Sequence, residues 1–206
     1  MSAAGDGVTI HDGAVVAPDV VIGRGAVIGK PPVSGRASRA PAPSPRRTEI
    51  GAGATIGTLA VIHAGARIAA GAVVGDRASV GAGAVLGPGA VLGVGAAVGA
   101  NAMIGARVAV GAHAWVTSHT VVEDDVVIGP GVVTMNDTTA GRLSKSDALA
   151  PPVLRRACRV GACALVGPGT EVGEGAHVAP GALVMRDVAT GMRVEGIPAR
   201  AGDERR

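Results

Sequence analysis

A six-residue repeat of aliphatic residues constrains the fold of this chain more than any other feature of its sequence. From Ile50 to Ile128, every sixth residue is Ile, Leu or Val, fourteen positions without an exception. The residue after each of these anchors is Gly in ten cases, and the fourth residue after each is Ala, Val or Thr. One large aliphatic residue, one small residue and one turn-permissive Gly per hexad is the pattern of a parallel β-helix, in which each hexad supplies a short strand and a corner.

The same frame extends beyond this run. Four anchors precede it, from Ile10 to Ile28, and six follow it, from Leu154 to Val184. A helical interpretation fails, because Gly at this density in helix interiors would cost about 1 kcal/mol per residue relative to Ala. The chain has no Phe or Tyr, so its core must be narrow and built from small aliphatic side chains. We therefore predict one all-β domain over 1–206, with β-helix coils over 8–29, 50–136 and 153–189, extruded loops over 30–49 and 137–152, and a C-terminal tail over 190–206.

Composition excludes several classes of function. With 19 basic against 16 acidic residues, and Trp115 as the one aromatic ring on which a base could stack, nucleic acid binding is not expected. The uncharged stretch 78–106 has the length of a membrane span, but eight glycines interrupt it, so we expect no membrane segment. The N-terminus lacks a basic region followed by an apolar stretch, and the two cysteines, five apart, match no disulfide framework or zinc pattern. These features predict a cytoplasmic, reduced protein.

Two segments carry a resemblance to a known family. They read VVEDDVVIGPGVVTMNDTTAGR over 121–142 and VLRRACRVGACALVGPGTEVGEGAHVAPGALVMRDV from residue 153, followed by VEGIPAR. Together with the repeat, they resemble the left-handed hexapeptide-repeat acyltransferases, and most of all the N-acetyltransferases that act on amino groups of nucleotide-linked sugars. The resemblance implies a left-handed parallel β-helix, a homotrimer with active sites between neighbouring prisms, and acetyl-CoA as co-substrate without a metal.

The resemblance also implies residues for the acceptor. Asn136 matches the family's turn residue that contacts or orients the sugar amine, and Glu123 and Asp124 match its acidic triplet, so both are candidate substrate-binding residues. After that turn the family continues to an aromatic residue and Pro-Arg, whereas this chain runs through Thr138 to Arg142. Arg142 is a further candidate substrate-binding residue, and the departure leaves open the identity of both the sugar and its nucleotide, UDP or dTDP.

Three hexads complete one coil in this family, so residues 18 apart stack at the strand spacing of about 4.8 Å. Asn101, His119 and Asp137 form such a column. His119 beside the Asp137 carboxylate is a candidate general base or amine-positioning group. We therefore name His119, Asn136 and Asp137 as candidate catalytic residues, and Asn101 as a candidate substrate-binding residue. The alternative is that polar residues at a corner simply face solvent.

One histidine interrupts the glycine pattern. His63 follows an anchor at a position where Gly is usual, which makes it a further candidate substrate-binding residue, although a purely structural role is the alternative.

The C-terminal third resembles the coenzyme A half of these enzymes. The resemblance places pantetheine along the backbone amides of two corners, Arg186 near the phosphates, and Ile197 and Pro198 near adenine; the corner residues are Ala162, Ala164, Ala179 and Gly181. Arg155 belongs to a local basic set that suits the polyanionic coenzyme.

The two insertions should be neighbours in space. The first, 30–47, carries five prolines, five basic residues and no acid, so it is either a solvated loop or a basic arm that gathers phosphate-bearing ligands. Thr134 lies fourteen hexads after Ile50, which modulo three returns the chain to the face that holds Ile28. Both loops should therefore leave from the same corner of the prism.

Three other functions remain open. The acceptor of an acyltransferase could be another small molecule. A γ-class carbonic anhydrase shares the fold, but that class pairs two histidines with four residues between them, whereas His113 and His119 have five. A non-catalytic structural trimer is the third alternative.

Overall fold

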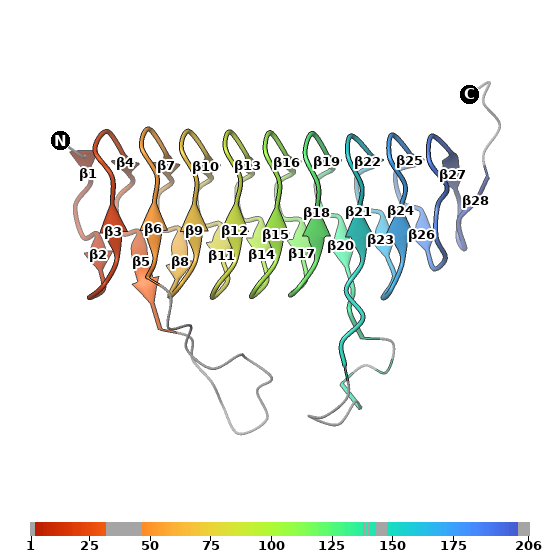
Figure 1. The fold of residues 1–206 in the computed structure, drawn as a ribbon, viewed down its shortest axis with the longest axis horizontal. Helices are drawn as coiled ribbons and strands as arrows, with labels where there is room; N and C mark the ends of the chain where they lie inside the picture. Colours follow the sequence, from red (N-terminus) through yellow and green to blue (C-terminus); the bar gives the residue numbers. More distant parts are fainter. Residues whose placement is uncertain (1–2, 32–46, 138, 140, 143–147, 202–206) are drawn as a thin grey trace.

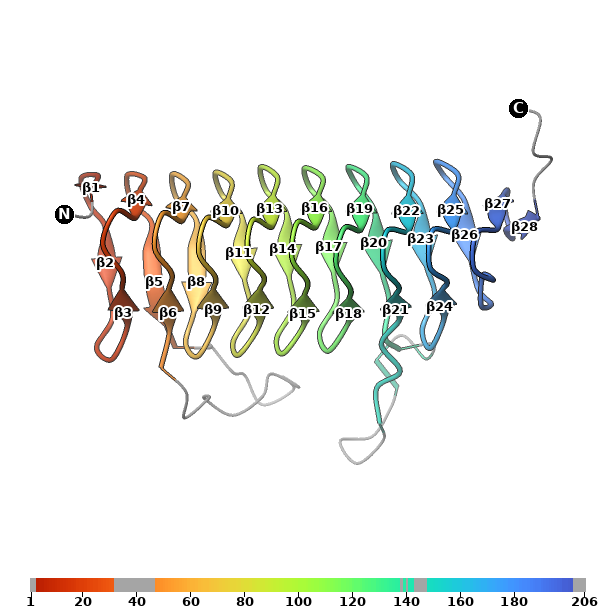
Figure 2. The ribbon, with the colours of Figure 1, turned by 45° about the horizontal axis from the view of Figure 1, so that its top comes forward.

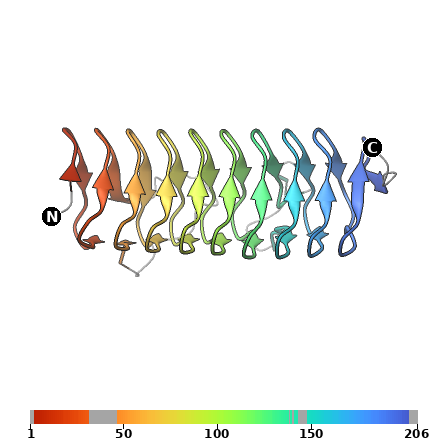
Figure 3. The ribbon, with the colours of Figure 1, turned by 90° about the horizontal axis from the view of Figure 1, so that it is seen from above.

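The computed structural model describes residues 3–31, 47–137, 139, 141–142 and 148–201. These residues form an all-β left-handed parallel β-helix, whose coils stack in a row to form a triangular prism (Figures 1 and 3). The hexapeptide prediction of the fold is thereby confirmed. The described residues contain no helix long and apolar enough to cross a membrane.

Each face of the prism is one sheet, called here A, B or C. Sheet A contains β1 (Ala3–Ala4), β4 (Val21–Ile22), β7 (Thr55–Ile56), β10 (Val73–Val74), β13 (Val91–Leu92), β16 (Ala109–Val110), β19 (Val127–Ile128), β22 (Arg159–Val160), β25 (His177–Val178), β27 (Arg193–Glu195) and β28 (Arg200–Ala201). Sheet B contains β2 (Thr9–Ile10), β5 (Val27–Lys30), β8 (Val61–His63), β11 (Ser79–Val80), β14 (Ala97–Val98), β17 (Trp115–Val116), β20 (Val133–Thr134), β23 (Leu165–Val166) and β26 (Leu183–Val184).

Sheet C contains β3 (Val15–Val16), β6 (Glu49–Ile50), β9 (Arg67–Ile68), β12 (Val85–Leu86), β15 (Met103–Ile104), β18 (Val121–Val122), β21 (Val153–Leu154) and β24 (Glu171–Val172). All pairings are parallel except that of β27 with β28. The chain visits A, B and C in turn, so that Val74 pairs with Ile56, eighteen residues earlier, across one coil.

The core lies along the axis of the prism. Every predicted anchor is the second residue of a strand, and all but the two nearest the N-terminal end, Ile10 and Val16, are buried. The fourth residue after an anchor, such as Ala54 or Ala90, is buried as well and fills the remaining space. Only small side chains fit there, because three strands converge on a narrow axis. This explains why the chain needs no aromatic core residue.

Each corner uses small residues for two different reasons. At its first position the backbone of the next coil passes so close that a Cβ on Gly93 would lie 2.6 Å from the Ala112 nitrogen. At its third position the chain takes a left-handed conformation, as at Gly71 with φ +66°. Ten of the described residues other than Gly also adopt positive φ. A positive φ is therefore the rule of the fold and does not by itself mark a functional site.

Both insertions leave from the same kind of corner, as predicted. The B–C corner is the edge where a sheet B strand leads into sheet C; it comprises 11–14, 63–66, 81–84, 99–102, 117–120, 135–136, 167–170 and 185–187. The first insertion separates β5 from β6 and the second separates β20 from β21, both at this edge (Figure 2). Residues 32–46 lie outside the described part, so the structure does not address the predicted basic arm.

Strands also form beyond the predicted coil boundaries. β1 precedes residue 8, and its second residue, Ala4, takes an anchor position without a large side chain. Near the C-terminus Val188 bridges to Val172, and Val194 pairs with Val178 only sixteen residues earlier. The last coil is thus shorter by two residues, which moves its anchors out of the six-residue frame.

Candidate active site

The B–C corner brings together the candidate residues Asn101 and His119. Both occupy the left-handed third position, with φ 55° and 64°, whereas the corresponding residues of other coils at this edge, Gly65, Gly83 and Gly169, are glycines. The amide of His119 donates to the Ala100 carbonyl at 2.9 Å, so the two corners stack directly. The predicted column of an amide and an imidazole is therefore present at this edge.

The His119 side chain is exposed, and it makes no hydrogen bond or ion pair with a described residue. An imidazole without such partners keeps a nitrogen lone pair available to a ligand. The corner can therefore present a proton acceptor to solvent or to a neighbouring molecule.

Two side chains fix the base of the second insertion, Thr134 and the predicted Asn136, and the sequence analysis assigned no role to Thr134. The buried Thr134 hydroxyl accepts a hydrogen bond from the Thr117 amide at 2.8 Å. Two residues after Thr134, the Asn136 side-chain nitrogen donates to the Ser118 carbonyl at 3.2 Å. This bond orients the Asn136 amide one coil above Ser118 and leaves its oxygen available to accept from a ligand N–H. The sequence does contain a signal for Thr134. This residue stands in the six-residue frame, where the predicted anchors are all Ile, Leu or Val, and it carries a hydroxyl instead.

Asp137 shapes the turn that follows. Its Oδ1 accepts from the backbone nitrogen and the hydroxyl of Thr139, both at 2.6 Å, and its Oδ2 accepts from Gly141 at 3.0 Å. These bonds close a local turn at the start of the insertion. That Asp137 also orients His119 stays a prediction. Arg142, in the same insertion, is exposed.

The acidic triplet lies on the neighbouring C–A corner, where sheet C leads into sheet A. Arg155 donates to Glu123 at 2.9 Å and to Glu171 at 2.7 Å, joining three successive coils. Asp124 accepts from the Ala106 amide at 2.8 Å. The hydrogen bonds from Arg155 lower the pKa values of Glu123 and Glu171 below the ordinary 4.5, and those two carboxylates raise the pKa of the guanidinium. Within one chain, these groups are separated from His119 by a whole face of the prism.

The pKa shifts predict a pH-dependent contribution to stability. Because the carboxylate pKa values are lowered in the folded state, the network stabilises the fold above pH 4.5 and loses this effect as pH falls through the lowered values. We expect Arg155→Met to lower Tm at neutral pH, and the difference from wild type to shrink as pH falls through the lowered pKa values. Thermal melts between neutral and acidic pH test this expectation. The control is Arg159→Met, because Arg159 is exposed and forms no ion pair with a described residue. An unchanged Tm difference at all pH values would contradict the assignment.

The predicted pantetheine corners stack on the A–B edge, where sheet A leads into sheet B. Gly181 donates to the Ala162 carbonyl at 2.8 Å, Ala179 to Val194 at 2.9 Å, and Ala164 to Gly161 at 3.2 Å. Those three amides are therefore already used by the chain itself. The Ala162 amide, in contrast, donates to no described residue, so this edge offers a ligand that amide and the small, open surface beside Gly181, where an added Cβ would meet nothing within 4 Å.

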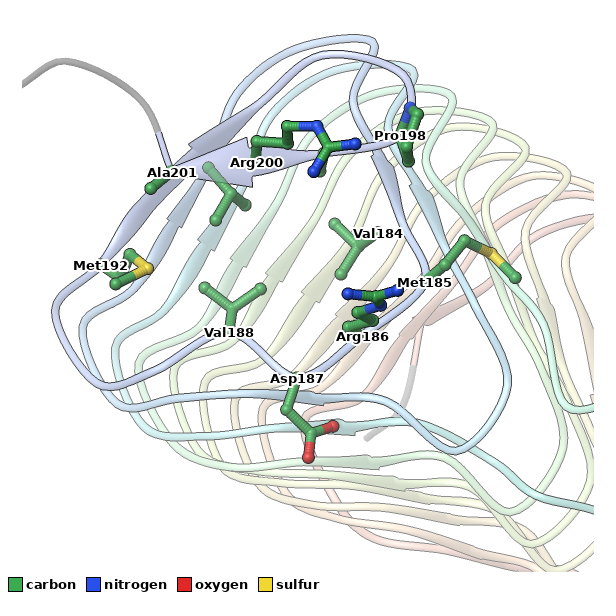
Figure 4. A pocket seen from close by; sticks show the side chains of 11 residues that line it. Val184, Met185, Arg186, Asp187, Val188, Met192, Pro198, Arg200 and Ala201 are labelled. Carbon is green, nitrogen blue, oxygen red and sulfur yellow. The ribbon is translucent and has the colours of Figure 1, made fainter.

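The C-terminal end of the prism holds a cavity of about 450 Å³ (Figure 4). Val184 and Val188 form its apolar floor, while Arg186 and Arg200 stand at its rim. Pro198 also lines it, and Ile197, at 77% exposure, lies in the same segment. Arg186 belongs to the B–C corner, so it shares an edge with His119, three coils away. Two arginines above an apolar floor form a surface that suits an anionic group attached to an apolar one.

The remaining histidines lie apart. His63 is on the B–C edge, three coils to the N-terminal side of His119, whereas His113 lies between β16 and β17 on the A–B edge. One chain therefore does not bring His113 and His119 to a common point. Among the residues that the structure describes, no group of three His, Cys, Asp or Glu side chains is arranged to hold a metal ion.

Comparison with solved structures identifies the fold. The UDP-N-acetylglucosamine acyltransferase from Campylobacter jejuni is 21% identical over 94% of this chain and 74% of that chain, with a TM-score of 0.58. The corresponding acyltransferase from Francisella novicida is 19% identical over 98% of this chain and 68% of that chain, with a TM-score of 0.51. At these identities the similarity establishes a shared β-helix fold.

The acetyltransferase domain of PglB from Neisseria gonorrhoeae FA1090 matches with 21% identity and a TM-score of 0.39. The match covers 94% of this chain and 57% of that one, so the chain spans little more than half of that relative's length. No protein-family model matches the chain, and no curated protein sequence matches it.

Proposed function

We propose that this protein is an acetyl-CoA-dependent N-acetyltransferase that acts on an amino group of a nucleotide-linked sugar. The observation that carries the proposal is the B–C corner itself. His119 presents there an exposed imidazole without a partner among the described residues, and Asn136, whose amide is bonded to the adjacent Ser118, lies in the next coil. Acyltransferases share the fold, and the second insertion begins at this corner.

The chemistry requires one bond to form and one to break. The neutral amine attacks the thioester carbon, the C–N bond forms, and the C–S bond breaks to release coenzyme A. Asn136 would accept a hydrogen bond from the amine and hold its lone pair toward the thioester. His119 would take the proton that the amine loses and pass it to the departing thiolate. Both steps need only groups that this corner presents.

The coenzyme would approach from the C-terminal side. Arg186 lies on the same edge as His119, and in the same cavity as Pro198. We place the coenzyme phosphates at Arg186, while the Ala162 amide and the small corner around Gly181 would contact pantetheine.

We expect Arg186→Ala to weaken coenzyme A binding by about 1 to 2 kcal/mol, the loss of one charge-assisted phosphate contact, with an unchanged melting temperature. Calorimetric titration with coenzyme A measures this. Arg67→Ala is the control, because Arg67 is an exposed arginine on the outer face of sheet C, far from the C-terminal coils. Equal affinity of wild type and Arg186→Ala at low salt would place the coenzyme elsewhere.

We also propose that the protein is cytoplasmic and that it forms a homotrimer. The A–B and B–C edges of one prism face different directions, so a second copy is needed to bring two such edges together. Exposed apolar residues flank the B–C edge on both faces: Trp115 and Leu165 on sheet B, Met103 and Val121 on sheet C. Burial of such surfaces between copies is favourable. Sedimentation should give three times 19.9 kDa, and a mass of 19.9 kDa at micromolar concentration would refute the trimer.

Binding of coenzyme A separates this function from its alternatives. A structural trimer or a carbonic anhydrase would show no calorimetric signal with coenzyme A, and the latter would carry metal by elemental analysis. Coenzyme A binding without metal is the expected result.

A further inference from the structure

The outer face of sheet A changes its chemical character at the C-terminal end. The first residue of each sheet A strand from β4 to β27 points outward, because the second residue is a buried anchor. From β4 to β19 these outward residues are all uncharged: Val21, Thr55, Val73, Val91, Ala109 and Val127. The next three strands, β22, β25 and β27, instead carry Arg159, His177 and Arg193 (Figure 1). These three residues are called here the basic row.

The basic row is in direct register. Arg159 pairs with His177, and His177 pairs with Arg193. Residues paired across parallel strands point to the same face at a spacing of about 4.8 Å, so two arginines flank the histidine from opposite sides. Both arginine side chains are long enough to reach an ion placed above the imidazole ring. The three groups can therefore act on one ligand.

The side chains of the basic row have few partners within the chain. Arg159 is exposed, His177 is half-buried, and neither side chain makes a hydrogen bond or ion pair with a described residue. The Arg193 side chain is only 30% exposed, and its Nε is buried without a hydrogen-bond partner in the described part of the chain. Arg193 thus lies close to the sheet, and a guanidinium held in this way loses little conformational freedom when a ligand binds.

The carboxylates near the basic row do not balance its charge. Arg193 Nη2 lies 3.5 Å from Glu195 Oε2, and Glu195 is also in register with Arg200 of β28. One carboxylate therefore stands between two arginines. On the C–A edge beside the row, Arg156 and Glu174 add one charge of each sign. The A–B corners 161–164 and 179–182, on the other side, add none. The face keeps an excess of positive charge, which attracts an anion.

The donors of the basic row suit a phosphate group better than a carboxylate. A guanidinium binds phosphate oxygens through paired N–H donors, and an imidazole N–H supplies a further donor. A terminal phosphate group has three free oxygens and up to two negative charges, so it can accept from three neighbouring side chains and balance two arginines. A carboxylate has two oxygens and one charge, and it would leave one arginine unbalanced.

We propose that Arg159, His177 and Arg193 form a binding site for a terminal phosphate group on the outer face of sheet A. The site is separate from the cavity lined by Arg186, which lies at the end of the prism. It does not rest on the proposed acetyl transfer. Two sources supply this chemistry, free inorganic phosphate and the 3′-phosphate of coenzyme A.

The direct test titrates the full chain with inorganic phosphate, without coenzyme A, and follows the ring signals of His177 by NMR. Arg159→Met is expected to weaken binding by about tenfold, for the loss of one charge-assisted contact, and Arg159→Lys by less, because it keeps the charge without the paired donors. The matched control is Arg67→Met, which removes an exposed arginine at the same strand position on sheet C. It should change the affinity less than about twofold. Equal weakening by Arg159→Met and Arg67→Met would overturn the site.

A second variant and a second anion sharpen the test. Arg193→Met should weaken phosphate binding as Arg159→Met does; since Arg159 is exposed, Arg159→Met decides the test if the partly buried Arg193 cannot be replaced without unfolding. Acetate, with one charge and two oxygens, should bind at least about tenfold more weakly than phosphate. Acetate binding as tight as that of phosphate would contradict the assignment.

Coenzyme A and its dephospho form, which lacks the 3′-phosphate, identify the source. If Arg159→Met weakens binding of coenzyme A but not of the dephospho form, the basic row holds the 3′-phosphate. If it weakens binding of inorganic phosphate alone, the row is a phosphate site independent of the coenzyme. If Arg159→Met and Arg193→Met leave the binding of all three unchanged, this inference is wrong, whether or not coenzyme binding depends on Arg186.

Discussion

Replacement of His119 by Asn is expected to lower kcat by a factor of about 10² to 10⁴, the usual contribution of a general base. Asn tolerates the left-handed conformation that His119 adopts, so the corner should keep its shape. The matched control is His113→Asn, because His113 is also exposed and has φ 57° but lies on the A–B edge. It should retain wild-type kcat.

Asn136→Ala should separate holding from proton transfer. Removal of the oriented amide is expected to raise the acceptor KM by about tenfold, corresponding to one hydrogen bond, with a smaller effect on kcat. The backbone bond from Ala150 to the Asn136 carbonyl remains in this variant, so the insertion keeps its anchor. Wild-type kinetics of both variants, with the oligomer intact, would remove this corner from the active site.

The second large effect concerns folding. Gly93→Ala should destabilise the protein by about 3 kcal/mol or more, because its Cβ would lie 2.6 Å from the Ala112 nitrogen and 2.9 Å from the Gly111 carbonyl carbon. These are backbone atoms of the next coil, which would have to shift to accommodate the added methyl group.

Gly71→Ala is the comparison that makes this test sharp. Gly71 has positive φ but nothing within 4 Å of an added Cβ, so the substitution should cost only about 1 kcal/mol. Denaturant unfolding of both variants measures the difference. A larger loss for Gly71→Ala than for Gly93→Ala would show that backbone conformation, not coil contact, explains the glycines of this fold.

The repeat predicted the fold well because the anchors report directly on the buried strand positions. It predicted less of the site, because counting the hexads gives the corner of each residue but not the corner at which a ligand binds. Glu123 and Asp124 lie in the corner that follows the one holding His119, as counting the hexads modulo three requires. The partner of Glu123, Arg155, is 32 residues distant because the second insertion intervenes, and this contact has no signal in the spacing.

Local irregularities were the features that the sequence pattern missed. The bulge at Gly29 arises where the chain leaves the coil, and it shifts Lys30 into register with His63. The shortened last coil moves Val188 and Val194 out of frame. Both depend on how the chain accommodates an interruption, which the positions of the anchors alone do not specify.

The central claim is acetyl transfer to a nucleotide-linked amino sugar, and a thiol-release assay tests it most directly. The purified protein is incubated with acetyl-CoA and a panel of UDP- and dTDP-linked amino sugars, with the corresponding hydroxy sugars as controls. We expect release of coenzyme A that depends on the amino group and falls at least about 100-fold in His119→Asn. Equal thiol release with amino and hydroxy sugars, or release that persists unchanged in His119→Asn, would contradict the account.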